Sequence, residues 1–373
     1  MPVTVLYAED QIADGSIERQ VFGDGITLMH RNAGSLSELT AADCAEVDGL
    51  MAMRFFVTRE DLTRFPKLKC IVRMGVGYDR IDRIAAAERN ILVCNVPDYG
   101  TTEVADHAIA LALTLRRGIL HYHDTQRAPV ADPVGIGLPK GLKDAQLKAQ
   151  GEGAPVAGGQ LKAQATAIAP WRPVTTGGLV RRLGVQTFGV VGLGRIGTAA
   201  ALRAKALGFR VAFYDPHLPN GSELALGVER ARTLEDLLRQ TDVLSIHAPL
   251  TKETRGLIGA RQIGLLKPQS VLVNTARGPI VDIDGVYEHL KSGHLAAAGL
   301  DVVPVEPPVE PLPKLIAAYR AREPWLTGRL VITPHAAYWS PQAEHDTRLK
   351  AAETIRAALL SNKPQNVITP DMD

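Results

Sequence analysis

Residues 188–197 read Phe-Gly-Val-Val-Gly-Leu-Gly-Arg-Ile-Gly. A short apolar run leads directly into the spacing Gly-x-Gly-x-x-Gly, and a helical stretch of small residues follows over 198–207. A second apolar run, 210–214, then ends on Asp215. Strand, glycine loop, helix, second strand and acidic residue, in this order, form the full pattern of a dinucleotide-binding βαβ unit. The stretch therefore predicts a parallel sheet with a cofactor site at its carboxyl edge.

The three glycines of this motif have separate expected roles. Gly192 permits the tight turn, Gly194 lets a pyrophosphate approach the backbone, and Gly197 lets the helix pack on the strand. The helix N-terminus offers unpaired N–H groups and the positive end of its dipole to the phosphates. A carboxylate at Asp215 accepts hydrogen bonds from both ribose hydroxyls and repels a 2′-phosphate, which predicts NAD in preference to NADP.

Length and composition narrow the class of protein. A chain of 373 residues is long enough for two domains with their own cores. A hydrophobic content of 46% and a formal net charge of +2 are typical of a soluble globular protein without nucleic-acid or membrane partners. Three cysteines without a C-x-x-C pair predict a reducing, cytoplasmic location. No metal site is predicted, because His121 and His123 have no further ligands at suitable spacing.

Apolar runs alternate with helical patterns along most of the chain. This alternation predicts an α/β protein with two doubly wound parallel sheets, the second a Rossmann sheet in the strand order 3-2-1-4-5-6. A helix from Thr101 to about His123, capped by Thr101 or Thr102, is expected to connect them, and a last helix over 340–360 to return to the first domain. The predicted strands are 3–7, 26–29, 48–51, 69–73 and 92–95, then 188–191, 210–214, 242–247, 270–274, 297–302 and 330–333.

Residues 128–178 differ from the rest of the chain. They contain nine Gly and six Pro, and the pentapeptide Gln-Leu-Lys-Ala-Gln occurs at 146–150 and again at 160–164. Such a segment buries little apolar surface, so it is predicted to be a loop or linker. An arm that embraces a partner subunit is the alternative interpretation.

Three charged residues follow the last three predicted strands of the second sheet. They are Arg277, Glu306 and His335, and ligands bind outside the carboxyl ends of parallel strands. Hydride transfer to a 2-oxo acid needs an acid that protonates the carbonyl oxygen, a cation that polarises it, and a carboxylate that favours the protonated imidazole. His335, Arg277 and Glu306 suit these roles in that order.

A second cluster, Arg73-Met-Gly-Val-Gly-Tyr-Asp79, follows a strand of the first sheet. We expect the N–H groups of Gly75, Val76 and Gly77 to form a nest for a substrate carboxylate, with Arg73 adding positive charge and Tyr78 lining the site. A simple glycine turn is the alternative. Candidates for the pocket around the substrate side chain are Arg54, Phe55, Tyr78, Tyr99, Tyr338 and Trp339.

Further cofactor contacts are predicted in the glycine loop and after the other strands of the second sheet. These candidates are Arg195, Ile196, His247, Ala248, Pro249, Thr254, Thr275, Ala276 and Asp301.

Taken in order, five motifs resemble the D-isomer-specific 2-hydroxyacid dehydrogenase family. They are the stretches 73–79, 192–197, 274–278 (Asn-Thr-Ala-Arg-Gly), 306–307 (Glu-Pro) and 334–337 (Pro-His-Ala-Ala). The resemblance spans nearly the whole chain apart from 128–178. Within the family, the stretches 94–97, 201–209, 213–216 and 334–340 look like the branch of the C-terminal binding proteins, which holds NAD-binding corepressors and their bacterial dehydrogenase-like relatives.

The resemblance implies an NAD-dependent oxidoreductase that interconverts a D-2-hydroxy acid and its 2-oxo acid. In it, Arg277 binds the carboxylate and carbonyl, His335 is the acid/base, and Glu306 is its partner. It also implies a cleft between a flavodoxin-like substrate domain (1–101 and 336–373) and a Rossmann domain (102–335), and a homodimer formed through the latter. An NAD-responsive, corepressor-like scaffold is the alternative function. One departure is the order Tyr338-Trp339, which the corepressor branch usually has reversed.

Overall fold

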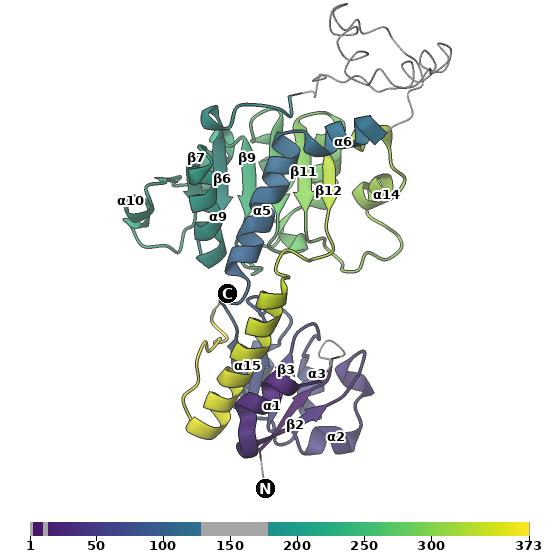
Figure 1. Cartoon of the computed structure of the whole chain (residues 1–373), viewed down its shortest axis with the longest axis vertical. Coiled ribbons are helices and arrows are strands. Elements are labelled where there is room, and N and C mark those ends of the chain that lie inside the picture. The colour runs from purple at the N-terminus through teal and green to yellow at the C-terminus, as the bar shows by residue number, and fades with distance from the viewer. Residues whose placement is uncertain (1–2, 10–13, 128–177, 373) are drawn as a thin grey trace, which may run out of the picture.

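The computed structural model describes residues 3–9, 14–127 and 178–372. It consists of two parallel sheets with helices on both faces, joined by α5 (Thr101–Arg116) (Figure 1). The predicted fold class is therefore confirmed. Nearly all of the predicted insertion at 128–178 lies outside the described residues.

The first sheet has five parallel strands in the order β2-β1-β3-β4-β5. This is the flavodoxin-like order, in which ligands bind at the carboxyl ends of the strands. The strands are β1 (Val3–Tyr7), β2 (Ile26–His30), β3 (Gly49–Ala52), β4 (Cys70–Arg73) and β5 (Leu92–Asn95).

The second sheet has seven parallel strands in the order β12-β11-β10-β9-β6-β7-β8. The order 3-2-1-4-5-6 holds only when β8 is counted as the third strand, and the sequence did not predict β8 because it is only two polar residues long. The predicted third strand, 242–247, therefore pairs with 188–191 and not, as that order required, with 210–214. The sheet thus has one strand more than expected. The strands are β6 (Thr187–Val191), β7 (Arg210–Tyr214), β8 (Glu229–Arg230), β9 (Val243–Ile246), β10 (Ser270–Asn274), β11 (Leu295–Leu300) and β12 (Leu330–Ile332).

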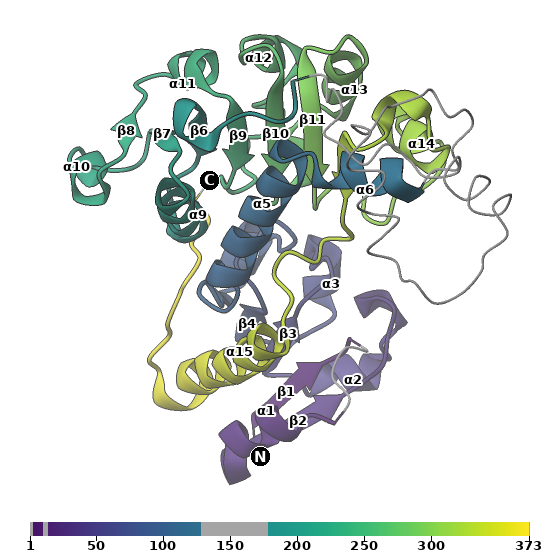
Figure 2. The same ribbon diagram turned by 45° about the horizontal axis from the view of Figure 1, so that its top comes forward.

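Helices cover both faces of each sheet, as Figures 1 and 2 show. None of those in the described part of the chain combines the length and apolarity needed to cross a membrane. Besides α5 they are α1 (Ser16–Phe22), α2 (Ala41–Ala45), α3 (Arg59–Thr63), α4 (Arg83–Glu88), α6 (Ile119–Arg127), α9 (Arg195–Ala206), α10 (Ser222–Leu226), α11 (Leu234–Gln240), α12 (Ala260–Gly264), α13 (Ile283–Lys291), α14 (Lys314–Arg320) and α15 (Pro341–Ser361).

The connection between the two sheets differs from its prediction in two ways. The single expected helix is two helices, because the chain turns at Gly118, whose φ of 64° is a left-handed conformation. The expected threonine cap is also wrong. Gly100 occupies the N-cap position without a side-chain hydrogen bond, Thr101 is already helical, and the Thr102 hydroxyl donates to Glu103 instead (2.7 Å).

The last helix returns to the first sheet, as predicted. Ser340 caps α15 by accepting a hydrogen bond from the Ala343 N–H (3.0 Å). Ala351, Ala352 and Ile355 of this helix are buried in a core shared with β1, β3, β4 and β5. Burying one such aliphatic side chain as large as Ile355 contributes about 1.5–3 kcal/mol. Both ends of the chain thus belong to the five-stranded unit, and the division at 101/102 and 335/336 stays a prediction.

Candidate active site

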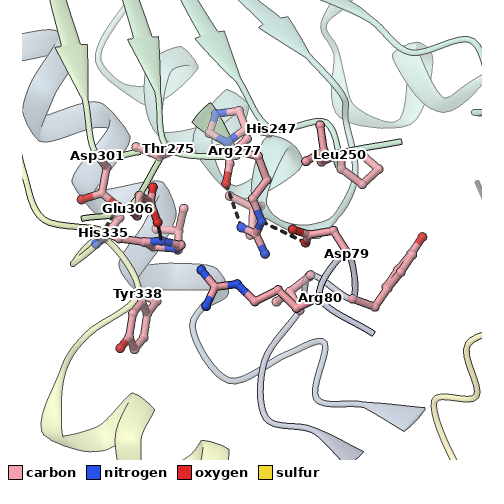
Figure 3. A pocket seen from close by; sticks show the side chains of 18 of the residues that line it. Asp79, Arg80, His247, Leu250, Thr275, Arg277, Asp301, Glu306, His335 and Tyr338 are labelled. Atoms are coloured by element: carbon pink, nitrogen blue, oxygen red, sulfur yellow. Dashed lines mark hydrogen bonds and ion pairs between the residues drawn. The ribbon is translucent and has the colours of Figure 1, made fainter. Parts of the chain in front are cut away.

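A cleft of about 910 Å³ lies between the two sheets and is lined by residues of both. Loops that line it follow the carboxyl ends of β3, β4 and β5 in the first sheet and of β6, β9, β10, β11 and β12 in the second. Two parallel sheets that face each other with their carboxyl edges bring together the two places where such sheets bind ligands. Figure 3 shows the side chains that project into this cleft.

The glycine motif occupies the turn between β6 and α9, and its three glycines serve different purposes. A Cβ at Gly192 (φ 86°) would lie 2.7 Å from the backbone nitrogen of Ala248, and a Cβ at Gly197 would collide with the Gly192 carbonyl oxygen. A Cβ at Gly194 would meet no atom within 4 Å. Gly192 and Gly197 are therefore required by packing, whereas Gly194, the N-cap of α9, faces open space in the cleft.

On the side of the cleft formed by the seven-stranded unit, two buried polar atoms lack partners among the described residues: Thr275 Oγ1 and His247 Nδ1. The other ring nitrogen of His247 lies 2.8 Å from Ser245 Oγ, and burial lowers the pKa of this imidazole to about 4, so that it is neutral at pH 7. Buried polar groups normally find partners. Together with the open helix terminus at Gly194, these atoms fit a dinucleotide bound along this edge.

Asp215 is held beside the glycine loop at the end of β7. Its carboxylate accepts hydrogen bonds from the backbone N–H groups of Leu193 (2.9 Å) and His217 (3.0 Å). Thr254 is placed differently from its prediction, because its hydroxyl donates to the Pro249 carbonyl (2.6 Å) within a local turn. Of the predicted cofactor residues, Gly192, Gly197, Asp215 and Thr254 do not line the cleft, whereas the others do.

His335 and Glu306 form a close pair in the cleft (Figure 3). His335 Nδ1 lies 2.7 Å from Glu306 Oε2, and the other Glu306 oxygen accepts from the Val303 N–H (3.1 Å). Burial opposes ionisation of Glu306, but the hydrogen bond and charge of His335 and the Val303 N–H outweigh it and lower the pKa of Glu306. The carboxylate therefore fixes one nitrogen of the imidazole and leaves Nε2 for a ligand.

Asp301 holds the loop that carries His335, a role that was not predicted from the sequence. Its side chain, 1% exposed, accepts from the Thr333 hydroxyl (2.6 Å) and from the N–H groups of Ala336 (2.9 Å) and Ala337 (3.0 Å). Its backbone carbonyl accepts from the His335 N–H (2.8 Å), where His335 has a φ of 53°. Asp301 lines the cleft, as expected of a cofactor contact, but its carboxylate is engaged in holding the loop that carries His335.

Arg277 is held from the opposite domain. Its Nε donates to Asp79 Oδ1 (3.1 Å) and its Nη1 to the Ala276 carbonyl (2.8 Å). A Cβ at Gly77 would collide with the guanidinium, so only glycine leaves room for it there. Burial opposes ionisation of Asp79, yet the charge and hydrogen bond of Arg277 lower the pKa of this carboxyl. Asp79 belongs to the motif 73–79, but no local pattern indicates that its side chain pairs across the cleft.

The predicted anion nest is only partly present. The Gly75 N–H donates to the Arg73 carbonyl (2.9 Å), and Gly75 does not line the cleft, because the turn closes on itself. Val76, Gly77, Tyr78 and Arg73 do line it. Burial lowers the pKa of Arg73 to about 10, and its Nε has no partner among the described residues.

Aromatic side chains close one side of the cleft near His335. The rings of Tyr99 and Tyr338 meet edge to face at 5.9 Å, and those of His335 and Tyr338 at 6.2 Å. Arg54, Tyr78, Tyr99 and Tyr338 line the cleft as expected. Phe55 and Trp339 do not line it, and Trp339 is 58% exposed.

Comparison with known proteins agrees with this geometry. Residues 163–337 match the model of the NAD binding domain of D-isomer specific 2-hydroxyacid dehydrogenases. A glyoxylate reductase of Korarchaeum cryptofilum is 34% identical over 313 residues, which cover 82% of this chain and 78% of that protein. A D-3-phosphoglycerate dehydrogenase of Methanocaldococcus jannaschii is also 34% identical over 313 residues, which cover 84% of this chain but 49% of that protein, so the chain spans about half of its length.

Solved structures show the same fold. The D-lactate dehydrogenase of Aquifex aeolicus, complexed with NAD and lactic acid, superposes with a TM-score of 0.73 at 24% identity, over 96% of each chain. The predicted enzyme family and its NAD cofactor are confirmed by these matches. The chain belongs to the D-isomer specific 2-hydroxyacid dehydrogenase family, and its seven-stranded unit carries the NAD-binding domain of that family.

Proposed function

We propose that the protein interconverts a D-2-hydroxy acid and its 2-oxo acid with NAD. The observation that carries this proposal is the convergence of the His335–Glu306 pair (2.7 Å) and Arg277 on one cleft beside the glycine loop. The names of the two relatives, a glyoxylate reductase and a phosphoglycerate dehydrogenase, support a small 2-oxo or 2-hydroxy acid as substrate.

The cofactor would lie along the glycine loop. The N-terminus of α9 at Gly194 would hold its pyrophosphate, and Asp215 would accept from the ribose hydroxyls. Bound NADH supplies the hydride in reduction, and bound NAD accepts it in oxidation. The Asp215 carboxylate disfavours the extra phosphate of NADP.

Arg277 binds and polarises the substrate. With Nε on Asp79 and Nη1 on the Ala276 carbonyl, its Nη2 has no hydrogen bond to the described part of the chain and is available to the substrate. A guanidinium donates well to a carboxylate and a neighbouring carbonyl oxygen at once. Its charge favours the carbonyl oxygen most when that oxygen becomes negative in the transition state.

His335 moves the proton. Its Nδ1–H is held by the ionised Glu306, so its Nε2 donates a proton to the carbonyl oxygen in reduction and takes one from the hydroxyl in oxidation. The Glu306 carboxylate stabilises the protonated imidazole by charge pairing. Asp301 holds the loop in place through the N–H groups of residues 335–337.

The proposal also covers the branch of the family, the cellular location and the oligomeric state. The stretches 94–97 and 334–340 support a position in the C-terminal binding protein-like branch. The buried, unpaired cysteines Cys44, Cys70 and Cys94 support a cytoplasmic location. We expect a homodimer formed through the NAD-binding domain and no direct contact with nucleic acid.

A turnover assay tests the proposal against the scaffold alternative. The protein is mixed with NADH and a panel of 2-oxo acids, and the loss of NADH absorbance is followed. We expect reduction of at least one acid to its D-hydroxy product, identified by chiral chromatography. Tight NADH binding without turnover of any acid would favour the scaffold.

A further inference from the structure

The substrate half of the cleft carries more positive charge than one carboxylate needs. Arg73, Arg80 and Arg277 all line it, and Figure 3 shows Arg80 extending across the cleft below Arg277, toward Tyr338. Asp79 pairs with Arg277 (3.1 Å), but within the described ranges no carboxylate forms an ion pair with Arg73 or Arg80. A monoanionic 2-oxo acid bound to Arg277 would leave the guanidinium groups of Arg73 and Arg80 without a carboxylate in direct contact.

The charges of these groups act on one another. Burial lowers the pKa of Arg73 to about 10, and the positive charges of Arg277 and Arg80 contribute to this lowering. The charge of Arg80 also adds, after His335 and the Val303 N–H, to the effects that lower the pKa of Glu306 against the opposing effect of burial. Like charges brought together at low exposure favour an anion between them. Arg80 therefore lies within electrostatic reach of both the Arg73 side and the His335 side of the cleft.

Arg80 is held in this position without any ligand. Its Nη1 donates to the Arg54 carbonyl (2.6 Å), and its guanidinium lies 5.2 Å from the centre of the Phe56 ring. The segment carrying that carbonyl is fixed by Glu9, which is 2% exposed and accepts from the N–H groups of Met53 (2.6 Å) and Arg54 (2.7 Å). The carbonyl and the ring that contact Arg80 are both neutral, so they orient its guanidinium without forming an ion pair with it.

We propose that the substrate carries a second anionic group and that Arg80, together with Arg73, binds it. The inference rests on the proposed function, because it assigns the first carboxylate to Arg277. The substrate class is then a 2-oxo acid whose side chain ends in a carboxylate or a phosphate. A guanidinium binds either group with two parallel hydrogen bonds.

Matched pairs of substrates test this inference. With NADH, kcat/KM is measured for 2-oxoglutarate against 2-oxopentanoate, and for phosphohydroxypyruvate against hydroxypyruvate. Within each pair only one acid has the second charge, so the pair with the larger ratio identifies the group as carboxylate or phosphate. We expect a preference of about 10-fold or more for the charged acid in at least one pair, falling as salt rises.

Variants of Arg80 link the preference to this side chain. Arg80→Met keeps the apolar stem and should reduce the ratio of charged to uncharged substrate by about 10- to 100-fold, whereas Arg80→Lys should retain part of it. Arg59→Met is the matched control, because Arg59 pairs with Glu88 on the surface of the same domain and does not line the cleft. Its ratio should equal that of the wild type.

A binding measurement separates this inference from the proposed function. The same acids are titrated by calorimetry onto protein saturated with NAD, which cannot reduce them. Tighter binding of the charged acid that is lost in Arg80→Met supports the second anion site even if turnover fails. Equal affinities within both pairs, or a preference that Arg80→Met leaves intact, overturn the inference, and turnover of the uncharged acids then leaves the proposed function standing.

Discussion

Two loops of this protein have the spacing Gly-x-Gly after a parallel strand, and the structure uses them in opposite ways. In the loop after β6, Gly194 faces open space, so its missing side chain leaves room for a ligand. In the loop after β4, a Cβ at Gly75 would collide with Arg73 and a Cβ at Gly77 with Arg277. The absence of a side chain at Gly75 and at Gly77 leaves room for guanidinium groups of the protein itself. The same residue type thus leaves open space in the cleft in one domain and makes room for arginines in the other.

The largest expected effect tests whether the catalytic step can be lost while cofactor binding at the loop after β6 is kept. His335→Ala removes the proton donor and should lower kcat by roughly 10²–10⁴-fold. The dissociation constant of NADH, measured by fluorescence titration, should stay at the wild-type value because the glycine loop is untouched. An unchanged kcat would mean that His335 is structural and that another group provides the proton.

The next effect concerns Arg277, the arginine for which Gly77 leaves room in the loop after β4. Arg277→Ala should lower kcat by about 10²–10³-fold, because the charge on the carbonyl oxygen loses its partner. KM should rise as well, since the same guanidinium binds the substrate carboxylate. Steady-state kinetics with one 2-oxo acid measure both constants. A loss confined to kcat would contradict the carboxylate-binding role.

A pair of alanine substitutions addresses the comparison itself. Gly77→Ala should displace the Arg277 guanidinium and lower kcat/KM for the 2-oxo acid by up to about 10²-fold, with NADH affinity unchanged. Gly194→Ala should do the reverse, weakening NADH binding while the melting temperature stays close to that of the wild type, because a Cβ there meets no protein atom. If both variants impair the same step, the two loops do not have separate roles.

Cofactor choice sharpens the description of the first loop. Asp215→Ala removes a carboxylate held beside Gly194 by the Leu193 N–H, and should narrow the preference for NADH over NADPH by about 10- to 100-fold. The measurement is kcat/KM for each cofactor at a saturating 2-oxo acid concentration. Wild-type protein that uses both cofactors equally would already contradict this role of Asp215.

The smallest effect is a displacement of the pH profile. The pKa of Glu306 is lowered, so this carboxyl is ionised at neutral pH and stabilises the protonated form of His335. Reduction needs that form, so its rate should hold at low pH and fall as pH rises, while oxidation should rise over the same range. In Glu306→Gln both limbs should move to lower pH, because the protonated imidazole loses its charge partner. Superimposable profiles of kcat/KM against pH would mean that Glu306 does not act on His335.

Local patterns account for the parts of the structure that were predicted correctly. The apolar runs and the glycine motif act within a few residues of one another, and the strand positions follow from them. Errors arose where the local signal was weak or shared. Strand β8 is too short to show a pattern, and Thr101 is a plausible cap that the chain places one residue too far into the helix.

The sequence by itself determined the two sheets, the cofactor edge and the presence of Arg277, Glu306 and His335 after neighbouring strands, because the period of apolar residues and the loop glycines carry that information locally. Only the tertiary structure decided which partners these groups have. Asp79 forms a hydrogen bond with Arg277, which lies 198 positions away in the sequence. The Asp301 carboxylate accepts a hydrogen bond from Ala336, 35 positions away, in the loop that carries His335. Arg80 of the five-stranded unit lines the same cleft. Such contacts depend on how two separately folded sheets face each other, and no spacing within either segment encodes that arrangement.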